Sequence, residues 1–356
     1  MGNNGIGKHF VVTSFGESHG KAVGVVIDGC PPGLKLDLEW IAKQLQRRRP
    51  GQSNITTQRK ESDNFEIISG TFEGQTTGAP ICILIPNKNQ KKGDYDALKQ
   101  VYRPSHADFT YAQKYGHRDP FGGGRSSARI TAGWVAAGAI AQQLLNEKYG
   151  VRVTAFVQSI HTISMPATDL VPTETQIEAS VVRCPHEDSS KQMEERINKA
   201  MAEGDSLGGR IRVIIENCPI GIGEPVFNKL QAQLGHAMLN INAVKGFEYG
   251  TGFMSTRKTG KELNDEWDLI DGQPKTTSNN SGGIQGGIAN GMPIDFTVAF
   301  KPTSSISIEQ NTLDTDLKKV SLAIEGRHDP CVVPRAVPIV EAMAALVLVD
   351  NLDLNS

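Results

Sequence analysis

Runs of branched apolar residues, which predict strands, are the feature that most restricts how this chain can fold. They lie at residues 9–14, 22–28, 65–69, 81–86, 151–160, 210–216 and 294–300. Helical patterns occur between some of these runs, but they do not follow every run in turn, as they would in a doubly wound parallel sheet. The irregular order predicts an α+β fold or a layered sandwich. Because no low-complexity linker interrupts the pattern, we expect residues 1–356 to form a single domain.

The clearest helical pattern begins at Leu38, where apolar residues recur at one-turn spacing as far as Leu45. Asp37 stands where it can cap the first turn, and three consecutive arginines at 47–49 close the helix. Further helices are expected from Ser127 to about Lys148, at 191–202, at 226–239, and from Pro338, a suitable first-turn residue, to about Leu352.

The charge balance and the cysteines exclude several classes of protein. Lysine and arginine total 37 against 39 aspartates and glutamates, so the chain has no general basic field with which to hold nucleic acid. The five cysteines are scattered without a Cys-x-x-Cys pair, which argues against a disulfide framework or a thiolate metal site. No leader pattern and no apolar stretch of about 18 residues occurs. We therefore expect a soluble cytoplasmic protein that binds no nucleic acid, membrane or metal.

A glycine-rich segment at residues 122–129 (GGGRSSAR) is the strongest sign of a binding site. Glycines let a ligand approach the backbone closely, and hydroxyls together with the N–H groups of a helix start attract anions. The segment matches neither a Walker loop nor a dinucleotide-binding turn. It predicts an anion site, and Arg125 and Arg129, one helical turn apart, favour that prediction. A plain helix cap with a flexible lead-in is the alternative.

Charged and titratable residues in other loops extend this prediction. The arginines at 47–49, with Arg59 and Lys60 nearby, suit a phosphate or carboxylate, although charge runs are most often solvated surface. His19 and His106 lie in turns, and each can act as a general acid near neutral pH. A structural role for either histidine is equally open.

Three later loops contain similar residue types. They are glycine-rich at 281–287, hydroxyl-rich at 301–305, and polar at 326–331. Each can line a phosphorylated ligand, and turns alone explain them as well.

Taken together, these segments resemble the chorismate synthase family. The matching motifs occur in family order over nearly the whole chain: FGESHG at 15–20, RRRPG at 47–51, RPSHAD at 103–108, GGGRSSAR at 122–129, NAVKG at 242–246, KPTSS at 301–305 and RHDPC at 327–331. The family converts 5-enolpyruvylshikimate 3-phosphate to chorismate by 1,4-anti elimination of phosphate, and it requires reduced FMN without net redox change. The resemblance implies a carbon–oxygen lyase of the shikimate pathway, with a β-α-β sandwich fold and a homotetrameric assembly.

The resemblance also implies roles for single residues. His106 is expected to protonate the departing phosphate, His19 to protonate or hold the reduced flavin ring, and Asp329 to help the flavin nitrogen act as a base. The expected FMN contacts are Arg125, Ser126, Ser127, Asn242, Ala243, Gly286, Lys301, Pro302, Thr303, Ser304, Ser305 and Arg327. The expected contacts to the substrate anions are Arg48, Arg49, Arg129 and Arg335. A nicotinamide-phosphate contact is implied at Arg48 and a nearby arginine.

Two residues depart from the family pattern. Asn54 stands where several relatives have arginine, and Ile130 stands where relatives often have glutamate. The first change weakens an anion contact, and the second removes a local carboxylate. Because the shared motifs lie close together and no dinucleotide fingerprint occurs, we expect an external flavin reductase to supply reduced FMN.

Three rival classes remain open. A flavin oxidoreductase would turn over a substrate with net redox change, and a phosphate-binding protein would keep the loops without needing the histidines. An RNA-binding module would use residues 47–60.

Overall fold

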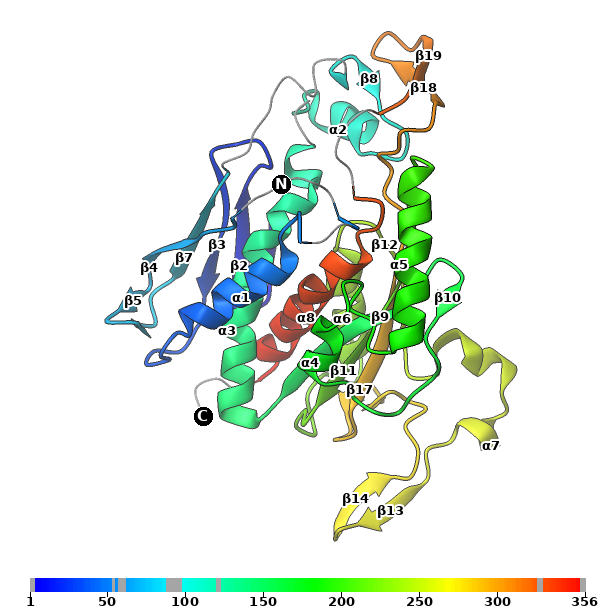
Figure 1. Ribbon diagram of the computed structural model, residues 1–356. Coiled ribbons are helices and arrows are strands. Elements are labelled where there is room, and N and C mark those ends of the chain that lie inside the picture. The colour runs from blue at the N-terminus through cyan, green and yellow to red at the C-terminus, as the bar shows by residue number, and fades with distance from the viewer. Residues whose placement is uncertain are drawn as a thin grey trace.

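Two antiparallel sheets form the main body of the computed structural model, which describes residues 4–52, 55–56, 62–87, 98–119, 123–324 and 329–352 (Figure 1). The strands of the first sheet are β1 (Gly5–Ile6), β2 (Val11–Gly16), β3 (Ala22–Asp28), β4 (Glu66–Ser69) and β7 (Ile81–Pro86). Those of the second are β9 (Arg152–Ile160), β10 (Ile163–Ser164), β11 (Gly209–Glu216), β12 (Val244–Tyr249) and β17 (Ile294–Phe300). Their orders in space are β1-β2-β3-β7-β4 and β10-β9-β11-β17-β12.

The strand predictions are confirmed. The strands predicted at 22–28, 81–86 and 294–300 have those bounds, three others differ by one residue at the start, and the strand predicted at 9–14 is shifted by two residues to 11–16. In β17 every second residue is fully buried, as the alternation of a strand with one face on the core requires. Shorter strands pair as β5 (Thr71–Phe72) with β6 (Gln75–Thr76), as β15 (Ile284–Gln285) with β16 (Ile288–Ala289), and in a small sheet of β8 (Val101–Tyr102), β18 (Gln310–Asp314) and β19 (Lys319–Leu322).

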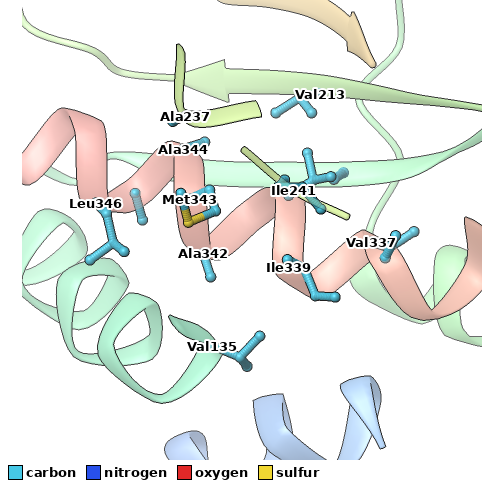
Figure 2. Packing of buried hydrophobic residues seen from close by; sticks show 14 of the residues in the cluster. Val135, Val213, Ala237, Ile241, Val337, Ile339, Ala342, Met343, Ala344 and Leu346 are labelled. Atoms are coloured by element: carbon cyan, nitrogen blue, oxygen red, sulfur yellow. The ribbon is translucent and has the colours of Figure 1, made fainter. Parts of the chain in front are cut away.

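Two long helices, α3 (Thr131–Tyr149) and α8 (Val333–Asp350), lie between the sheets. α3 packs against β3 and β7, α8 packs against β9 and β11, and the two helices pack against each other. The contact is close at Gly138, where an added Cβ would lie 2.3 Å from the Ala342 Cβ. Figure 2 shows Ala342, Met343 and Leu346 of α8 among apolar side chains from α3, β11 and the region of α6 (Leu230–Leu239). One continuous cluster of buried apolar side chains includes both helices and both sheets. The α+β class is therefore confirmed.

The remaining helices of the main body are α1 (Leu38–Arg48), α2 (Asp108–Tyr115), α4 (Glu174–Glu178) and α5 (Glu187–Ala202). The cap of α1 is confirmed, since the Trp40 N–H donates to Asp37 Oδ1 at 2.8 Å. α2 was not expected from the sequence. Among the described residues, no helix combines the length and apolar character needed to cross a membrane.

Four helix starts differ from the prediction, and those of α3, α5 and α6 differ as follows. α3 begins at Thr131 instead of Ser127, because two 3-10 turns, η2 (Gly124–Ser126) and η3 (Ala128–Ile130), precede it. The glycine-rich segment therefore does not run straight into α3. α5 begins at Glu187, where His186 Nδ1 accepts the Ser189 N–H. α6 begins at Leu230, because Asn228 has a left-handed φ of 63°.

The prediction that the last helix starts at Pro338 is wrong. α8 begins five residues earlier, at Val333, and Pro338 lies inside it. A proline inside a helix leaves the carbonyl four residues before it without an N–H partner, which here is the carbonyl of Pro334. Arg183 Nη1 replaces that donor at 2.6 Å. A side chain distant in the sequence thus completes the helix, and no local pattern predicts this.

Residues 251–278, which we call the arm, project from the main body at the lower right of Figure 1. The arm contains η4 (Gly252–Arg257), α7 (Gly260–Leu263) and the hairpin of β13 (Trp267–Ile270) and β14 (Gln273–Thr276). At its base, the Asp265 carboxylate accepts the Ser278 hydroxyl at 2.6 Å. Phe253, Trp267 and Leu269 are 77%, 55% and 71% exposed.

Candidate active site

A buried cluster of charges links α1 to the start of α3. Asp63, whose side chain is fully buried, accepts from Arg48 Nη1 at 3.0 Å and also pairs with Arg129 Nη1. Arg48 donates further to the Thr131 hydroxyl at 3.2 Å and to the Ala128 carbonyl at 2.8 Å. The cluster therefore fixes the turn η3, which follows the glycine-rich segment.

A second ion pair extends this cluster to the start of α8. Arg335 Nη1 pairs with Asp329 Oδ2, and Arg335 Nε donates to the Arg48 carbonyl at 3.3 Å. The three guanidiniums of Arg48, Arg129 and Arg335 thus meet two carboxylates, Asp63 and Asp329. One positive charge remains in excess, which favours an anionic ligand nearby.

Burial and the neighbouring charges act in opposite directions on these groups. Burial raises the pKa of the Asp63 carboxyl, but the Arg48 and Arg129 guanidiniums outweigh it and hold that pKa below its usual value. Burial lowers the pKa of Arg48 to about 10; Asp63 opposes this decrease, and Arg335 and Arg129 add to it. Arg48 therefore remains a cation at neutral pH.

His106 lies beside the hydroxyl-rich loop that follows β17. Its Nε2 lies 3.0 Å from Ser305 Oγ, and the Ser304 hydroxyl donates to the Ser105 carbonyl at 3.3 Å. Ser105 has a left-handed φ of 57°, which makes the turn before His106 sharp. The Thr303 hydroxyl donates to the Asp329 carbonyl at 3.0 Å. One short loop thus joins His106 to the Asp329–Arg335 pair.

Lys301, at the start of the same loop, donates through Nζ to the Ser304 hydroxyl and the Pro302 carbonyl. Burial and the nearby Lys245 lower the pKa of Lys301. Its backbone N–H donates to the Ala243 carbonyl at 2.9 Å. Ala243 has a left-handed φ of 69° and directly follows Asn242. The segments at 242–243 and 301–305 are therefore neighbours, as the resemblance implies.

His19 lies in the turn between β2 and β3. Its Nδ1 lies 3.0 Å from Ser18 Oγ. The Asn87 amide donates from Nδ2 to two carbonyls of this turn, and its Oδ1 accepts from Arg129 Nε at 2.8 Å. The His19 turn is therefore joined to the same charge cluster that reaches His106 from the other side.

An open cleft of about 980 Å³ lies next to the glycine-rich segment. Arg125, Ser126 and Asn242 line it, together with Ala107 and Asp108, which follow His106. Asn242 Nδ2 donates to the Ser126 carbonyl at 2.8 Å, and Asn242 Oδ1 is buried with no hydrogen-bond partner among the described residues. Buried polar atoms are usually hydrogen-bonded, so this acceptor is exceptional.

Of the expected site residues that the structure describes, Arg125, Ser126 and Asn242 line this cleft, and the others, including His19, His106, Asp329 and the loop at 301–305, do not. Arg125 uses its guanidinium to hold the chain of β2, through the Ser14 hydroxyl and the Gly16 carbonyl. The Ser127 hydroxyl accepts the Arg129 N–H and so caps η3. Gly286 lies in the turn between β15 and β16, next to the start of α6, whereas Asn242 lies beyond the other end of that helix. Arg327 and Asn54 lie outside the described residues.

The three consecutive arginines have different environments. Arg47 turns away from the cluster and pairs with Glu341 and Glu178, and Arg48 is 2% exposed. Arg49 is partly exposed, and its side chain makes no hydrogen bond or ion pair with any other described residue. Of the three, Arg49 has the guanidinium most available to a ligand.

Two residues of the site were not found from the sequence. Asp63 and Asn87 lie outside every motif, and a lone carboxylate or amide in a polar stretch gives no local signal. Both are recognised only because their partners come from distant segments. Ile130, noted as a departure from the family pattern, is buried and lines the cleft. Within the described residues, no group of three His, Cys, Asp or Glu side chains is placed to hold a metal ion.

Comparisons with known proteins agree with the motifs. The sequence profile described as chorismate synthase matches residues 10–352. The chain is 54% identical to a chorismate synthase of Opitutus terrae over 98% of its own length and 96% of that protein. It is 53% identical to one of Synechocystis sp. over 99% and 97% of the two chains. A crystal structure of chorismate synthase, 30% identical, superimposes with a TM-score of 0.76 over 97% of this chain and 92% of the other.

Proposed function

Because the chain belongs to the chorismate synthase family, whose members are lyases that remove phosphate, we propose that it converts 5-enolpyruvylshikimate 3-phosphate to chorismate with reduced FMN. The observation that carries this proposal is the continuous set of hydrogen bonds from the His19 turn to His106. It runs through Asn87, Arg129, Asp63, Arg48, Arg335, Asp329 and the loop at 303–305.

The architecture supports the fold and domain expectations of the resemblance. We propose that the helix pair between two sheets forms the family's β-α-β sandwich, and that residues 1–356 are one domain. The single apolar cluster shared by both sheets supports both proposals.

The proposed substrate carries a phosphate and two carboxylates, and the excess positive charge around Asp63 and Asp329 suits such a trianionic ligand. Arg49 and Arg335 are proposed to contact it directly. Arg48 and Arg129, which are both buried, are proposed to act mainly through their charge and by fixing η3. The proposed nicotinamide-phosphate contact at Arg48 would need that side chain to leave Asp63.

Each histidine is proposed to hold a proton at a defined ring nitrogen. The Ser305 hydroxyl beside His106 Nε2 orients that ring, and a protonated His106 is suited to neutralise a leaving phosphate. The Ser18 hydroxyl beside His19 Nδ1 orients the second ring, so that its Nε2 is proposed to act toward the flavin. Asp329, held by Arg335, is proposed to assist proton removal at the flavin nitrogen.

The cleft fits the proposed cofactor in size and chemistry. Cofactor sites commonly measure about 300–1,000 Å³, and the cleft is lined by Asn242, whose buried Oδ1 has no hydrogen-bond partner among the described residues and is proposed to accept from a ring N–H. Arg125, Ser126, Ser127, Asn242 and Ala243 are proposed to hold FMN on one side, with the 301–305 loop and Arg327 on another. Bound reduced FMN would supply electron density to the substrate without net oxidation.

The proposed assembly is a homotetramer, and the exposed apolar residues of the arm support an interface between copies. Gly286 lies at the far end of α6 from Asn242 and does not line the cleft, so its FMN contact is proposed from the resemblance alone. The proposed source of reduced FMN is a separate flavin reductase.

Substitution of the two histidines tests the proposed function. His106→Ala and His19→Ala should each lower kcat about 10²–10⁴-fold, since a positioned general acid contributes about that much. Spectroscopic titration with FMN, with and without substrate, should show nearly unchanged FMN binding, because many other groups hold the cofactor. His161→Ala is the control, because this exposed histidine has a similar hydroxyl contact, with Thr162, outside the site. Normal turnover by either site variant would remove that histidine from the mechanism.

A further inference from the structure

Asn87 uses both ends of its side-chain amide within the site. Its Nδ2 donates to the Glu17 carbonyl and to the Gly20 carbonyl, each at 2.9 Å. Its Oδ1 accepts from Arg129 Nε at 2.8 Å. Glu17 precedes His19 and Gly20 follows it, so one amide group is hydrogen-bonded to the turn on both sides of the histidine.

The sheet register explains why Asn87 reaches this turn. Ala22 of β3 pairs with Pro86 of β7, so Asn87, which follows Pro86, lies opposite Lys21. The Asn87 N–H donates to the Lys21 carbonyl at 3.0 Å. The polar side chain that directly follows β7 therefore lies beside the β2–β3 turn. The Gly20 N–H also donates to the Glu17 carbonyl, which closes a tight turn within the span that Asn87 holds.

The charge cluster fixes which way the Asn87 amide points. An arginine N–H can only donate, so the amide oxygen must face Arg129 and the amide nitrogen must face the turn. Arg129 is itself held by the fully buried Asp63 and by the Pro86 carbonyl at 3.3 Å. The amide thus cannot rotate without losing its contacts on both sides.

We propose that Asn87 is a positioning residue for His19: it transmits the fixed geometry of the Arg129–Asp63 pair to the turn that carries the histidine. The inference rests on the proposed role of His19. It assigns Asn87 no contact with substrate or cofactor. Misplacement of a catalytic group by about 1 Å can lower the rate about 100-fold. Loss of the Asn87 hydrogen bonds should therefore lower kcat.

Two variants separate the two ends of the amide. Asn87→Asp keeps an acceptor for Arg129 and removes both donors to the turn, whereas Asn87→Ala removes all three contacts. Each should lower kcat by about 10–100-fold while the KM for the phosphorylated substrate changes little. Asn217→Asp is the matched control, because Asn217 Nδ2 also donates to a distant carbonyl, that of Gly150, outside the site.

A double-mutant cycle identifies the group through which Asn87 acts. Combined with His19→Ala, Asn87→Asp should cost almost nothing more, because the positioned group is gone. Combined with His106→Ala, it should retain its full effect. In the ligand-free protein, NMR titration of labelled histidines should show an altered His19 ring in Asn87→Asp and an unchanged His106 ring.

The outcomes distinguish this inference from the proposed function. If His19→Ala is inactive but Asn87→Asp is fully active with an unaltered His19 titration, the inference is wrong and the proposed function stands. If both histidine signals shift together and the cycle is additive with His19→Ala, Asn87 has only a general structural role. Full activity of His19→Ala overturns the proposed function first.

Discussion

The three consecutive arginines at 47–49 lie in three different environments. Helical geometry turns consecutive side chains by about 100°, so Arg47 meets Glu341, Arg48 meets Asp63, and Arg49 remains partly exposed at the end of α1. The sequence predicted that a charged cluster closes this helix. It could not predict which arginine is available, because Asp63 and Glu341 come from distant segments.

Arg49→Ala should therefore affect substrate binding, whereas Arg48→Ala should affect stability. Loss of Arg49 should raise the substrate KM by about tenfold or more, since a hydrogen bond to a charged group contributes about 1.5–3 kcal/mol, and should leave the free energy of unfolding nearly unchanged. Loss of Arg48 should lower that free energy by about 3–5 kcal/mol, because it breaks a buried pair. Steady-state kinetics and denaturant unfolding of both variants test this. Equal KM values for Arg49→Ala and wild type would return Arg49 to a solvated surface role.

Asp63 should make stability depend on pH. Its pKa is held below the ordinary carboxyl value, so its stabilising effect is fully present above a pH of about 4 and is lost as the pH falls through the lowered pKa. Asp63→Asn should lower the free energy of unfolding at pH 7 by about 3–5 kcal/mol. The difference from wild type should shrink below a pH of about 4.

Urea unfolding across this pH range measures the effect. Asp271→Asn, in the exposed turn between β13 and β14, is the control, because it removes a carboxylate outside the buried cluster. A constant difference between wild type and Asp63→Asn down to acid pH would show that Asp63 does not titrate as described.

Local sequence patterns were sufficient to predict helices and strands whose apolar residues form one buried face. Runs of branched apolar residues predicted β17 and β3, and a capping aspartate predicted the start of α1. They were insufficient where a distant group completes an element. The start of α8 was missed because Arg183 satisfies the Pro334 carbonyl, and the start of α3 was missed because glycines of positive φ lead into 3-10 turns.

The close packing of α3 against α8 requires glycine at position 138, because glycine has no Cβ. Gly138→Ala should lower the free energy of unfolding by about 1–3 kcal/mol, because the added Cβ meets the Ala342 Cβ at 2.3 Å and the helices must separate. Gly260→Ala is the control, since nothing lies within 4 Å of an added Cβ there. Thermal unfolding of both variants tests the contact. A more stable Gly138→Ala, as expected from helix propensity alone, would contradict it.

For the whole molecule, residue patterns indicated an α+β fold or a layered sandwich, and only the family resemblance implied the β-α-β arrangement. That arrangement depends on pairings between distant strands, such as β11 with β17, which no local pattern specifies. The arm was likewise not anticipated. A two-stranded hairpin is marginally stable alone in water, and β13 is exposed along its whole length.

The arm should therefore stabilise contacts between copies of the chain. We expect the wild-type protein to have the mass of a tetramer in light scattering, and Phe253→Asp with Leu269→Asp to lower that mass. Leu170→Asp is the control, because Leu170 is 79% exposed but lies outside the arm. A monomeric wild-type protein, or an unchanged mass in the arm variant, would contradict this role.

We propose that one site, joining both histidines through the arginine–aspartate cluster, eliminates phosphate without net redox change. The most direct measurement is an anaerobic assay with 5-enolpyruvylshikimate 3-phosphate and reduced FMN that quantifies chorismate, phosphate and flavin together. We expect equal amounts of chorismate and phosphate, no net oxidation of FMN, and no chorismate from oxidised FMN with NADPH in air. Oxidation of flavin in proportion to product, or release of phosphate without chorismate, would contradict it.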